Sequence, residues 1–493
     1  MFGVAVQADG KIVVAGEGVQ GRRLNFAVAR FQPDGSLDPA FGRHGVKLAP
    51  PGCCATVALQ GDGKIVAGGS RSFPGDELQF ALTRYDPDGS LDRSFSGDGT
   101  VKTFIAEPAS GISALALQTD AKIIAAGTVF GSVAAPFGKI ALARYNADGS
   151  LDTGFGTGGI VRTDWAGGLK SAGHAVAIQS NGKIVVAGAV SARLLGGSSD
   201  MFALARYQPD GSLDTTFGSN GLVTTPIEDG ASASGLALQP DGKIVAAGGA
   251  ITRTVGTAPE YRFALARYNS DGSLDASFGS GGKVTTQFVD CAECDLDFGA
   301  VAEGVALQTD GKLVLAGAEF GSGESSRGRF ALARYNPNGS LDTSFGIDGK
   351  VRTSFDFAAP SNGDSGDVAT SVDLQTDGKV VAAGFSNYGP HAERYKAALA
   401  RYEADGSLDG SFGSGGKVSA SLDMCRVPRV KGKRLRDARP AIQRSHCSVG
   451  RIRYRFSRRV KRKHVISQRP RPGSVRADRA RVKLVVSKGA RRR

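Results

Sequence analysis

Residue types that usually carry catalysis or bind metals are thinly spread along this chain of 493 residues. The histidines are His44, His174, His391, His446 and His464. None of them forms a His-Glu-x-x-His pair or another metal-ligand spacing. Glycine-rich stretches such as residues 279–283 connect apolar runs of strand length, so a phosphate cradle would lack its helix N-terminus. The sequence therefore predicts no catalytic residues, no metal site and no cofactor.

Carboxylates gather in a recurring turn, for example in residues 86–92, where Asp86, Asp88 and Asp92 lie close together. Such a cluster could hold calcium, but the glycine position and the missing distal glutamate depart from the EF-hand pattern. Asp and Gly are also the residues that tight turns require. We interpret these segments as turns.

An arginine and an aspartate recur together at seven places along the chain. The pairs are Arg30 and Asp38, Arg84 and Asp92, Arg144 and Asp152, Arg206 and Asp214, Arg267 and Asp275, Arg334 and Asp342, and Arg401 and Asp409. They could form a ring of ligand groups, but their repetition in every unit favours a structural role. Because a half-buried charge needs a partner, we predict that Arg and Asp pair across neighbouring strands of each unit.

These pairs belong to a phrase that returns seven times, in its clearest form at residues 236–248 and 263–275. The Asp or Asn of its first half falls at Asp9, Asp62, Asp120, Asn181, Asp241, Asp310 and Asp377. The period is roughly 60 residues, which indicates a repeat architecture. Short apolar runs bounded by Asp-Gly turns predict strands, four in each repeat, arranged as two tight hairpins in series.

Four-stranded antiparallel units repeated around an axis form a β-propeller, which leaves only short edges. A linear stack would instead need caps at both ends. We therefore predict an all-β fold, a seven-bladed β-propeller of four-stranded antiparallel blades, over residues 1–423. Its repeats span about residues 3–47, 55–101, 112–161, 173–223, 234–284, 302–351 and 369–418.

The repeats resemble the bacterial delta-60 repeat family. Its consensus reads much like residues 306–312 (Ala-Leu-Gln-Thr-Asp-Gly-Lys) followed by residues 330–342 of this chain. The resemblance covers about residues 3–418. It implies a propeller fold and no general biochemical activity.

The composition changes near residue 424. Residues 424–493 carry 26 Lys and Arg against 2 Asp and Glu, so the net charge is near −10 for the propeller and near +24 for the remainder. A segment this basic is usually a disordered or nucleic-acid-binding arm. Apolar residues nevertheless alternate over residues 452–456 and again over residues 482–486, which predicts strands of a small folded domain.

This segment resembles a PASTA domain. The matching residues are Cys425 to Pro428, Gly432, Leu435, Ala438, Ile442, Cys447 to Gly450, Val465 to Gln468, Pro470 to Gly473 and Val482 to Gly489. The resemblance implies a small α+β domain over residues 424–490, followed by a basic tail at 491–493. PASTA domains occur outside the bacterial membrane, where some bind peptidoglycan fragments and others are spacers. Pro440 inside the expected helix and Arg479 in place of a turn glycine predict local distortion.

The cysteines fall into three groups. Cys425 and Cys447 would bracket the first strand and helix of the small domain, and we predict a disulfide between them because so small a domain gains from a staple. Cys291 and Cys294 lack the context of a redox motif or a zinc site, which favours a loop disulfide. An ordinary bridge within the adjacent pair Cys53-Cys54 would be strained, and its partners stay open.

The strand order places both Asp-Gly hairpins of each blade on one face of the disc and the long connections on the other. The candidate ligand-face residues in these connections are Phe73, Phe130, Trp165, Phe288, Phe320, Phe355 and Tyr388. Loops on a rigid scaffold usually carry binding. Single aromatic residues in loops are, however, more often anchors that pack onto the scaffold.

No secretory signal peptide is visible, since residues 1–4 lead directly into the first turn. No apolar run is long enough to span a bilayer. Because an exported propeller should not begin in mid-strand, we expect a truncated N-terminus and an extracellular or cell-envelope location.

Our leading expectation is a non-enzymatic binding or scaffold protein of the envelope. Its propeller loops would bind a protein partner, and its basic domain would contact peptidoglycan or an anionic wall polymer, attracted over a Debye length of roughly 10 Å. We expect a monomer. An alternative is a propeller hydrolase or lyase, which needs non-repeated His, Asp or Glu residues in the central channel. A second alternative is nucleic-acid binding by the basic domain, which we consider the weakest.

Overall fold

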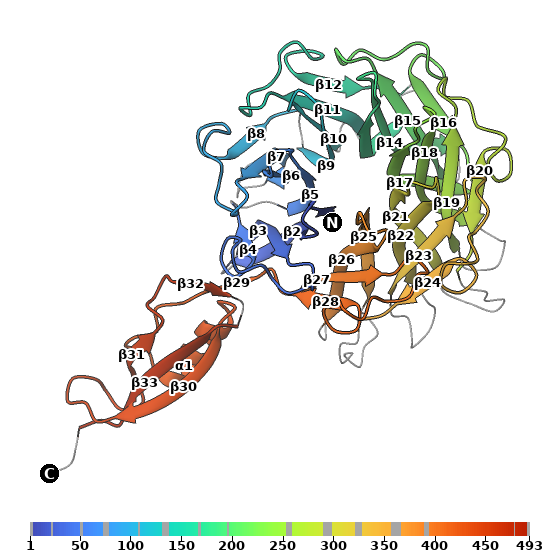
Figure 1. The fold of residues 1–493 in the computed structure, drawn as a ribbon. Helices are drawn as coiled ribbons and strands as arrows, with labels where there is room; N and C mark the ends of the chain where they lie inside the picture. The colour runs from blue at the N-terminus through green and yellow to red at the C-terminus, as the bar shows by residue number, and fades with distance from the viewer. Residues whose placement is uncertain are drawn as a thin grey trace.

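The computed structural model describes residues 3–20, 23–49, 53–71, 78–106, 109–130, 138–165, 169–194, 197–252, 259–288, 298–320, 328–355, 366–388, 394–477 and 479–490. The chain forms a ring of seven blades around a central channel, followed by a small separate domain (Figure 1). The predicted seven-bladed propeller of four-stranded antiparallel blades is confirmed.

The first three blades come from the first third of the chain. Blade 1 contains β1 (Gly3–Val6), β2 (Ile12–Gln20), β3 (Arg23–Phe31) and β4 (Val46–Leu48). Blade 2 contains β5 (Cys53–Leu59), β6 (Ile65–Arg71), β7 (Gln79–Tyr85) and β8 (Thr100–Thr103). Blade 3 contains β9 (Ala109–Leu117), β10 (Ile123–Phe130), β11 (Lys139–Tyr145) and β12 (Ile160–Thr163).

The other four blades follow in chain order. Blade 4 contains β13 (Lys170–Ile178), β14 (Ile184–Leu194), β15 (Gly197–Tyr207) and β16 (Leu222–Thr225). Blade 5 contains β17 (Gly230–Leu238), β18 (Ile244–Thr252), β19 (Glu260–Tyr268) and β20 (Lys283–Thr286). Blade 6 contains β21 (Phe298–Leu307), β22 (Leu313–Phe320), β23 (Arg329–Tyr335) and β24 (Lys350–Thr353). Blade 7 contains β25 (Asp367–Leu374), β26 (Val380–Tyr388), β27 (Arg394–Tyr402) and β28 (Lys417–Ala420).

The Asp-Gly turns fix where each pair of strands reverses. In blade 5 the two turn glycines, Gly242 and Gly272, have φ angles of 85° and 90°. Glycine takes this left-handed conformation without the steric cost that a Cβ brings. The Asp241 carboxylate also accepts a hydrogen bond from the Lys243 amide at 3.1 Å, which closes the turn locally. Tight turns of this kind keep consecutive strands next to each other in the sheet. Within the ring, the first strand of every blade lies at the channel and the fourth at the rim (Figure 1).

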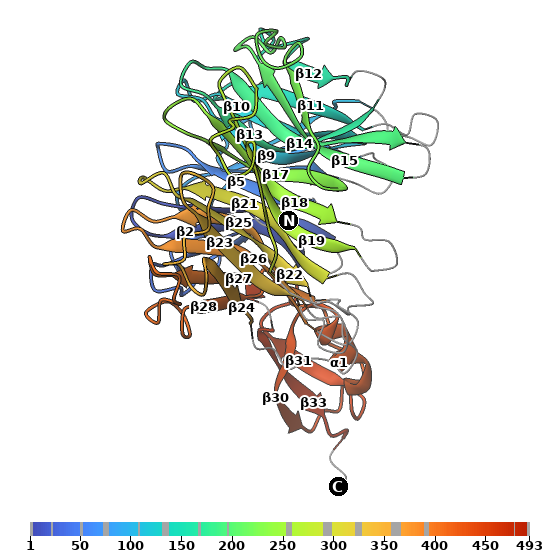
Figure 2. The same ribbon diagram turned by 90° about the vertical axis from the view of Figure 1, so that its right-hand side faces the viewer.

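Blades stack face to face, so their middle strands are buried on both sides (Figure 2). Between blades 4 and 5, Phe202 and Leu204 pack against Ala246 and Ala264. Small residues on one blade receive large ones from the next, as close packing requires. Even the buried tyrosine at this interface has a partner, because the Tyr268 hydroxyl donates to Thr225 Oγ1 at 2.8 Å.

Blades 1 and 7 close the ring without exchanging a strand. The amide of Val6 in β1 donates to Asp373 Oδ2 of β25 at 2.8 Å. The amide of Gly413 donates to the Asp34 carbonyl at 2.7 Å. One hydrophobic cluster spans both blades, with Val14 and Ala27 on one side and Leu399 on the other.

The small domain contains β29 (Met424–Arg426), α1 (Leu435–Gln443), β30 (Ser448–Arg455), β31 (Val465–Arg469), β32 (Val475–Ala477) and β33 (Arg481–Ser487). Helix α1 packs on the sheet of order β30, β33, β31. The helix continues through Pro440. Arg479 adopts a φ of 56°, the left-handed region that explains why glycine is usual at that turn. The domain joins the propeller where β29 pairs with the end of β2, Met424 opposite Gln20.

Candidate functional site

The inner strands of blades 3 to 7 carry a bulge at one equivalent position, and the register of the inner strand of blade 2 shifts as well. In blades 3 to 7 the register between the first and second strands shifts, which leaves one extra residue on the inner strand. These extra residues are Ser113, His174, Ser234, Glu303 and Thr370. Bulges redirect side chains and are common beside active sites.

A glycine on the second strand makes room for each bulge. In blade 4, a Cβ added to Gly188 would overlap the Ala172 carbonyl oxygen of the bulged strand. In blade 5, a Cβ on Gly248 would overlap the Ser232 carbonyl oxygen in the same way. The glycine that ends the repeated Val-Ala-Ala-Gly phrase is therefore needed for the bulge. The repeat fixes the bulge, while the residue that sits in it varies from blade to blade.

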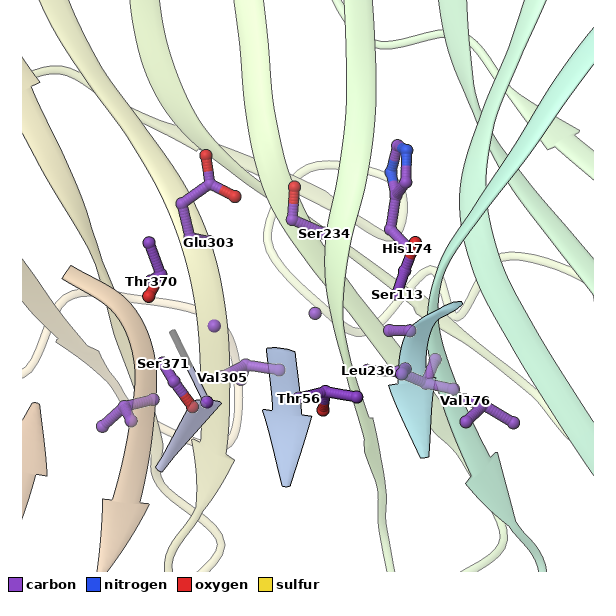
Figure 3. A pocket seen from close by; sticks show the side chains of 16 residues that line it. Thr56, Ser113, His174, Val176, Ser234, Leu236, Glu303, Val305, Thr370 and Ser371 are labelled. Atoms are coloured by element: carbon purple, nitrogen blue, oxygen red, sulfur yellow. The ribbon is translucent and has the colours of Figure 1, made fainter. Parts of the chain in front are cut away.

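The bulge residues line a cavity of about 410 Å³ in the central channel. Figure 3 shows Glu303, Ser234 and His174 projecting in the same direction from neighbouring strands, with Ser234 between the other two. The remaining polar lining is made of hydroxyl groups, including those of Thr56 and Ser371. His174 and Glu303 are the ionisable side chains among the described residues of this lining.

His174 is held by the neighbouring blade. Its Nδ1 lies 2.9 Å from the Ala233 carbonyl oxygen, which can only accept, so Nδ1 carries the hydrogen. Burial lowers the pKa of His174, while the Ala233 carbonyl and the charge of Asp200 oppose that shift. The ring is therefore neutral over a wider pH range than an exposed histidine. Its Nε2 keeps a lone pair that can accept a proton.

The pKa of Glu303 is shifted in the direction that favours its protonated form. Burial raises the pKa of the Glu303 carboxyl above its usual value, and a hydrogen bond with Ser234 partly opposes the shift. A carboxyl of this kind can donate a proton at pH values where an ordinary glutamate is ionised. Burial thus favours the neutral form of both groups, an imidazole that can accept a proton and a carboxyl that can donate one.

The repeated arginines and aspartates lie between the blades, away from the channel lining. In each blade the arginine Nε donates to the aspartate Oδ2 at 2.6 to 2.8 Å. Both side chains are largely buried. The same guanidinium donates to a turn carbonyl of the next blade, such as that of Ser270 for Arg206. Arg401 does the same with Pro33 of blade 1, so the series of contacts runs around the whole ring.

The candidate ligand-face aromatics mostly pack as anchors. Trp165, Phe288 and Phe355 are buried, and the Phe288 ring lies 4.6 Å from that of Phe263. Phe320 makes an edge contact with Tyr261, with ring centroids 5.9 Å apart. Phe130 is 45% exposed. Phe73 and the side chain of Tyr388 lie outside the described residues.

The structure joins Cys425 and Cys447 in a disulfide. Cys291 and Cys294 lie outside the described residues, as do the side chains of Cys53-Cys54. Among the described residues, no group of three or more His, Cys, Asp or Glu side chains is placed to hold a metal ion. The same part of the chain contains no helix that is both long and apolar enough to cross a membrane.

Sequence reasoning missed His174 and Glu303, although a signal was present. Aligned on the Asp-Gly-Lys turn, the position seven residues before its Asp or Asn holds Phe2, Ala55, Ser113, His174, Ser234, Glu303 and Thr370. This position holds an apolar, a hydroxyl-bearing or an ionisable residue, depending on the blade, whereas the surrounding positions hold similar residues in every repeat. A variable position inside a constant phrase is the signal that would have found the site.

Fold and channel together define a β-propeller whose inner strands place two ionisable side chains, His174 and Glu303, in the channel lining. The chain belongs to the DUF5122 β-propeller family, a domain of unknown function, whose model matches residues 7–41, 60–95, 118–155, 179–217, 239–278, 308–345 and 375–412. Delta-60 repeat is a name that fits this family. The PASTA model matches residues 426–488, which indicates association with the cell envelope. None of the curated proteins compared with the sequence matches it.

Solved structures share the propeller architecture at low identity. The polysaccharide lyase Uly1 is 11% identical, covers 82% of this chain and 89% of its own, and has a TM-score of 0.45. A polysaccharide lyase of family PL25, an ulvan lyase, is 10% identical over 84% and 92%, with a TM-score of 0.43. A glucose dehydrogenase is 15% identical over 64% and 92%, with a TM-score of 0.35. At these values the likeness is one of fold, and the substrates belong to those proteins.

The expectation of a non-enzymatic scaffold is wrong. It rested on the premise that the chain offers only repeated ionisable residues, and His174 and Glu303 in the channel contradict that premise. The alternative of a hydrolase or lyase with a site in the channel agrees better with these findings.

Proposed function

We propose that the chain is a hydrolase or lyase that acts in the central channel of the propeller, with Glu303 as general acid and His174 as general base. The observation that carries this proposal is the opposite direction of the two pKa shifts in one cavity. Acid and base groups placed in this way each contribute roughly 10²- to 10⁴-fold to a rate.

Each group has a defined part in bond cleavage. The Glu303 carboxyl gives its proton to the leaving oxygen as the scissile bond breaks. His174 Nε2 takes a proton either from an attacking water, which is hydrolysis, or from the carbon adjacent to the one that carries the leaving oxygen, which is β-elimination. The hydroxyls of Ser113, Ser234 and Thr370 can hydrogen-bond the hydroxyl groups of a carbohydrate.

We further propose that the substrate is a carbohydrate polymer of the cell wall and that the PASTA domain holds the enzyme on it. The family of this domain and the Cys425 to Cys447 disulfide support an extracellular setting, because disulfides persist in oxidising compartments. A protein partner on the loop face and a monomeric state remain part of this proposal.

The test is cleavage of isolated cell walls and of purified wall and uronic-acid polysaccharides by the full chain. Glu303→Gln and His174→Gln should each lower kcat by about 100-fold or more. Lys170→Gln changes an exposed residue of β13 that does not line the cavity, so it is the control and should retain most activity. A hydrolase adds one water across the cleaved bond, whereas a lyase adds none and leaves an unsaturated sugar that absorbs in the ultraviolet. Wild-type turnover in both channel variants, or no cleavage of any of these polymers, would refute the proposal.

A further inference from the structure

One face of the C-terminal sheet carries a dense group of cations. Arg453 of β30 pairs with Val485 of β33, and Lys483 of β33 pairs with Arg469 of β31. Paired residues project to the same face of a sheet, and so do residues two apart on one strand. The cationic sheet face defined in this way consists of Arg453, Arg455, Arg469, Arg481 and Lys483.

The opposite face of this sheet forms the core of the domain. Val482, Leu484 and Val486 of β33 are buried against Ala438 and Ile442 of α1. The first half of the strand therefore alternates between cation and core, with Arg481 and Lys483 facing outward and Val482 and Leu484 facing the helix. All members of the cationic sheet face are exposed in the complete chain, so neither α1 nor the propeller covers them.

These cations have no counter-charge in the described part of the protein. None of the five takes part in an ion pair or side-chain hydrogen bond there. The acidic residue of α1, Asp437, lies beside Arg436 instead. Neighbours in a sheet are about 5 Å apart across strands and about 7 Å apart at alternate positions along a strand. Like charges at such distances repel, and a bound anion would remove that repulsion.

We propose that the cationic sheet face binds a linear polyanion, namely a phosphodiester-linked polymer of the cell wall. Four of its five cations are arginines, whose planar guanidinium matches a phosphate with two parallel hydrogen bonds. A flat row of such groups fits an extended chain that carries one charge in each repeat. This inference takes the location at the cell wall from the proposed function. The binding chemistry does not depend on it.

Nucleic acid is the other polyanion that such a surface could bind, and three features count against it. The aromatic residue of β30, Tyr454, pairs with Val486 and so lies on the opposite face, which leaves no ring for bases to stack on. The flat face presents no helix that could enter a major groove. The disulfide between Cys425 and Cys447 also favours a compartment outside the cytosol.

The experiment measures binding of fluorescent poly(glycerol phosphate) to the full chain at several salt concentrations. It uses the Glu303→Gln background so that cleavage does not interfere. Five phosphate contacts predict a slope of log K against log salt of about −3.5, taking about 0.7 for each contact on a flexible chain. Affinity should therefore fall roughly 100-fold between 50 and 200 mM salt.

The double variant Arg453→Gln with Lys483→Gln removes two of the contacts. Its slope of log K against log salt should become shallower, about −2, and its binding should be weaker. Arg439→Gln is the matched control, because Arg439 is an exposed cation on α1, outside the cationic sheet face. The control should keep the full slope, and far-ultraviolet circular dichroism of both variants checks that the domain stays folded.

Several results would overturn the inference. They are a slope near zero, an equal loss of slope in the control and the double variant, and equal affinity for polygalacturonate or for single-stranded DNA. The outcome is independent of the proposed enzyme function. If the wild-type chain cleaves no polymer but binds poly(glycerol phosphate) as described, only the enzyme proposal fails. If it cleaves a wall polymer but shows none of this binding, only the present inference fails.

Discussion

Each repeated arginine joins two blades, and replacing one of them measures what that joint contributes. Arg267→Met keeps much of the apolar length of the side chain but removes the guanidinium. In the structure Arg267 Nε donates to Asp275 Oδ2 at 2.7 Å, and the guanidinium also donates to the Pro337 carbonyl of the next blade. Its central carbon lies 4.5 Å from the centroid of the Phe278 ring.

The expected loss follows from these contacts. The side chains of Arg267 and Asp275 are 7% and 9% exposed, and removing one partner of a buried pair costs about 3 to 5 kcal/mol. Asp275 keeps Lys243 at 3.2 Å and a hydrogen bond from Ser277, which places the loss at the lower end of that range. The Pro337 carbonyl loses a charged donor, which adds about 1 kcal/mol. We expect the variant to lose about 3 to 4 kcal/mol of unfolding free energy.

Urea unfolding measures this loss, and the fluorescence of the single tryptophan, the buried Trp165, reports it. Lys243→Met is the matched control. Lys243 bonds the same aspartate but is 30% exposed, so its loss should cost only about 0.5 to 1 kcal/mol. A loss below about 1 kcal/mol for Arg267→Met, or one no larger than in the control, would refute the reasoning.

Acid should weaken the same joints. A hydrogen bond from Ser277, with Lys243 and Arg267 nearby, holds the pKa of Asp275 well below its usual value. The corresponding aspartates of blades 2, 4, 6 and 7 shift in the same direction despite partial burial, which opposes it. A depressed folded-state pKa contributes stability that is complete above the unfolded value of about 3.9 and is lost as pH falls below it. We expect unfolding free energy to decrease below about pH 4, and to decrease by less in Arg267→Met, because the pKa of Asp275 is less depressed without the guanidinium.

Three further predictions concern the small domain and the channel. Reduction of the Cys425 to Cys447 disulfide should lower the unfolding free energy of the small domain by about 3 kcal/mol, so that its circular dichroism signal is lost at a lower temperature. Equal free-thiol counts before and after reduction would contradict the bond. Gly188→Ala should push the Ala172 carbonyl away, lowering both melting temperature and kcat through the displaced His174, and unchanged values would show that the bulge is not needed. Activity should fall on the acid side as His174 takes up a proton, at a pH below about 6.5 because burial lowers its pKa, and on the alkaline side as Glu303 loses its proton, at a pH above about 4.3 because burial raises its pKa. The acid limb should disappear in His174→Gln, and an alkaline optimum would exclude these roles.

The propeller could be predicted from the sequence because its determinants are local and occur seven times. Asp-Gly turns, short apolar strands and a constant order of elements leave few architectures that hide the strand edges. The Arg and Asp partners could also be anticipated, since burial demands neutralisation of charge. The second contact of each arginine, to a carbonyl in the next blade, could not be anticipated, because it depends on how far neighbouring blades are rotated about the axis.

The acid and base pair depends on tertiary structure for a different reason. His174 and Glu303 lie in blades 4 and 6, more than a hundred residues apart, and neither residue belongs to a recognisable motif. Closure of the ring brings their strands around one cavity, and the bulges direct both side chains into it. By itself the sequence determined the blades, their number and the basic domain, because hydrophobic period, turn residues and charge act locally. Only the closed ring decided which residues share the channel, and burial there sets the pKa shifts that would let them act together.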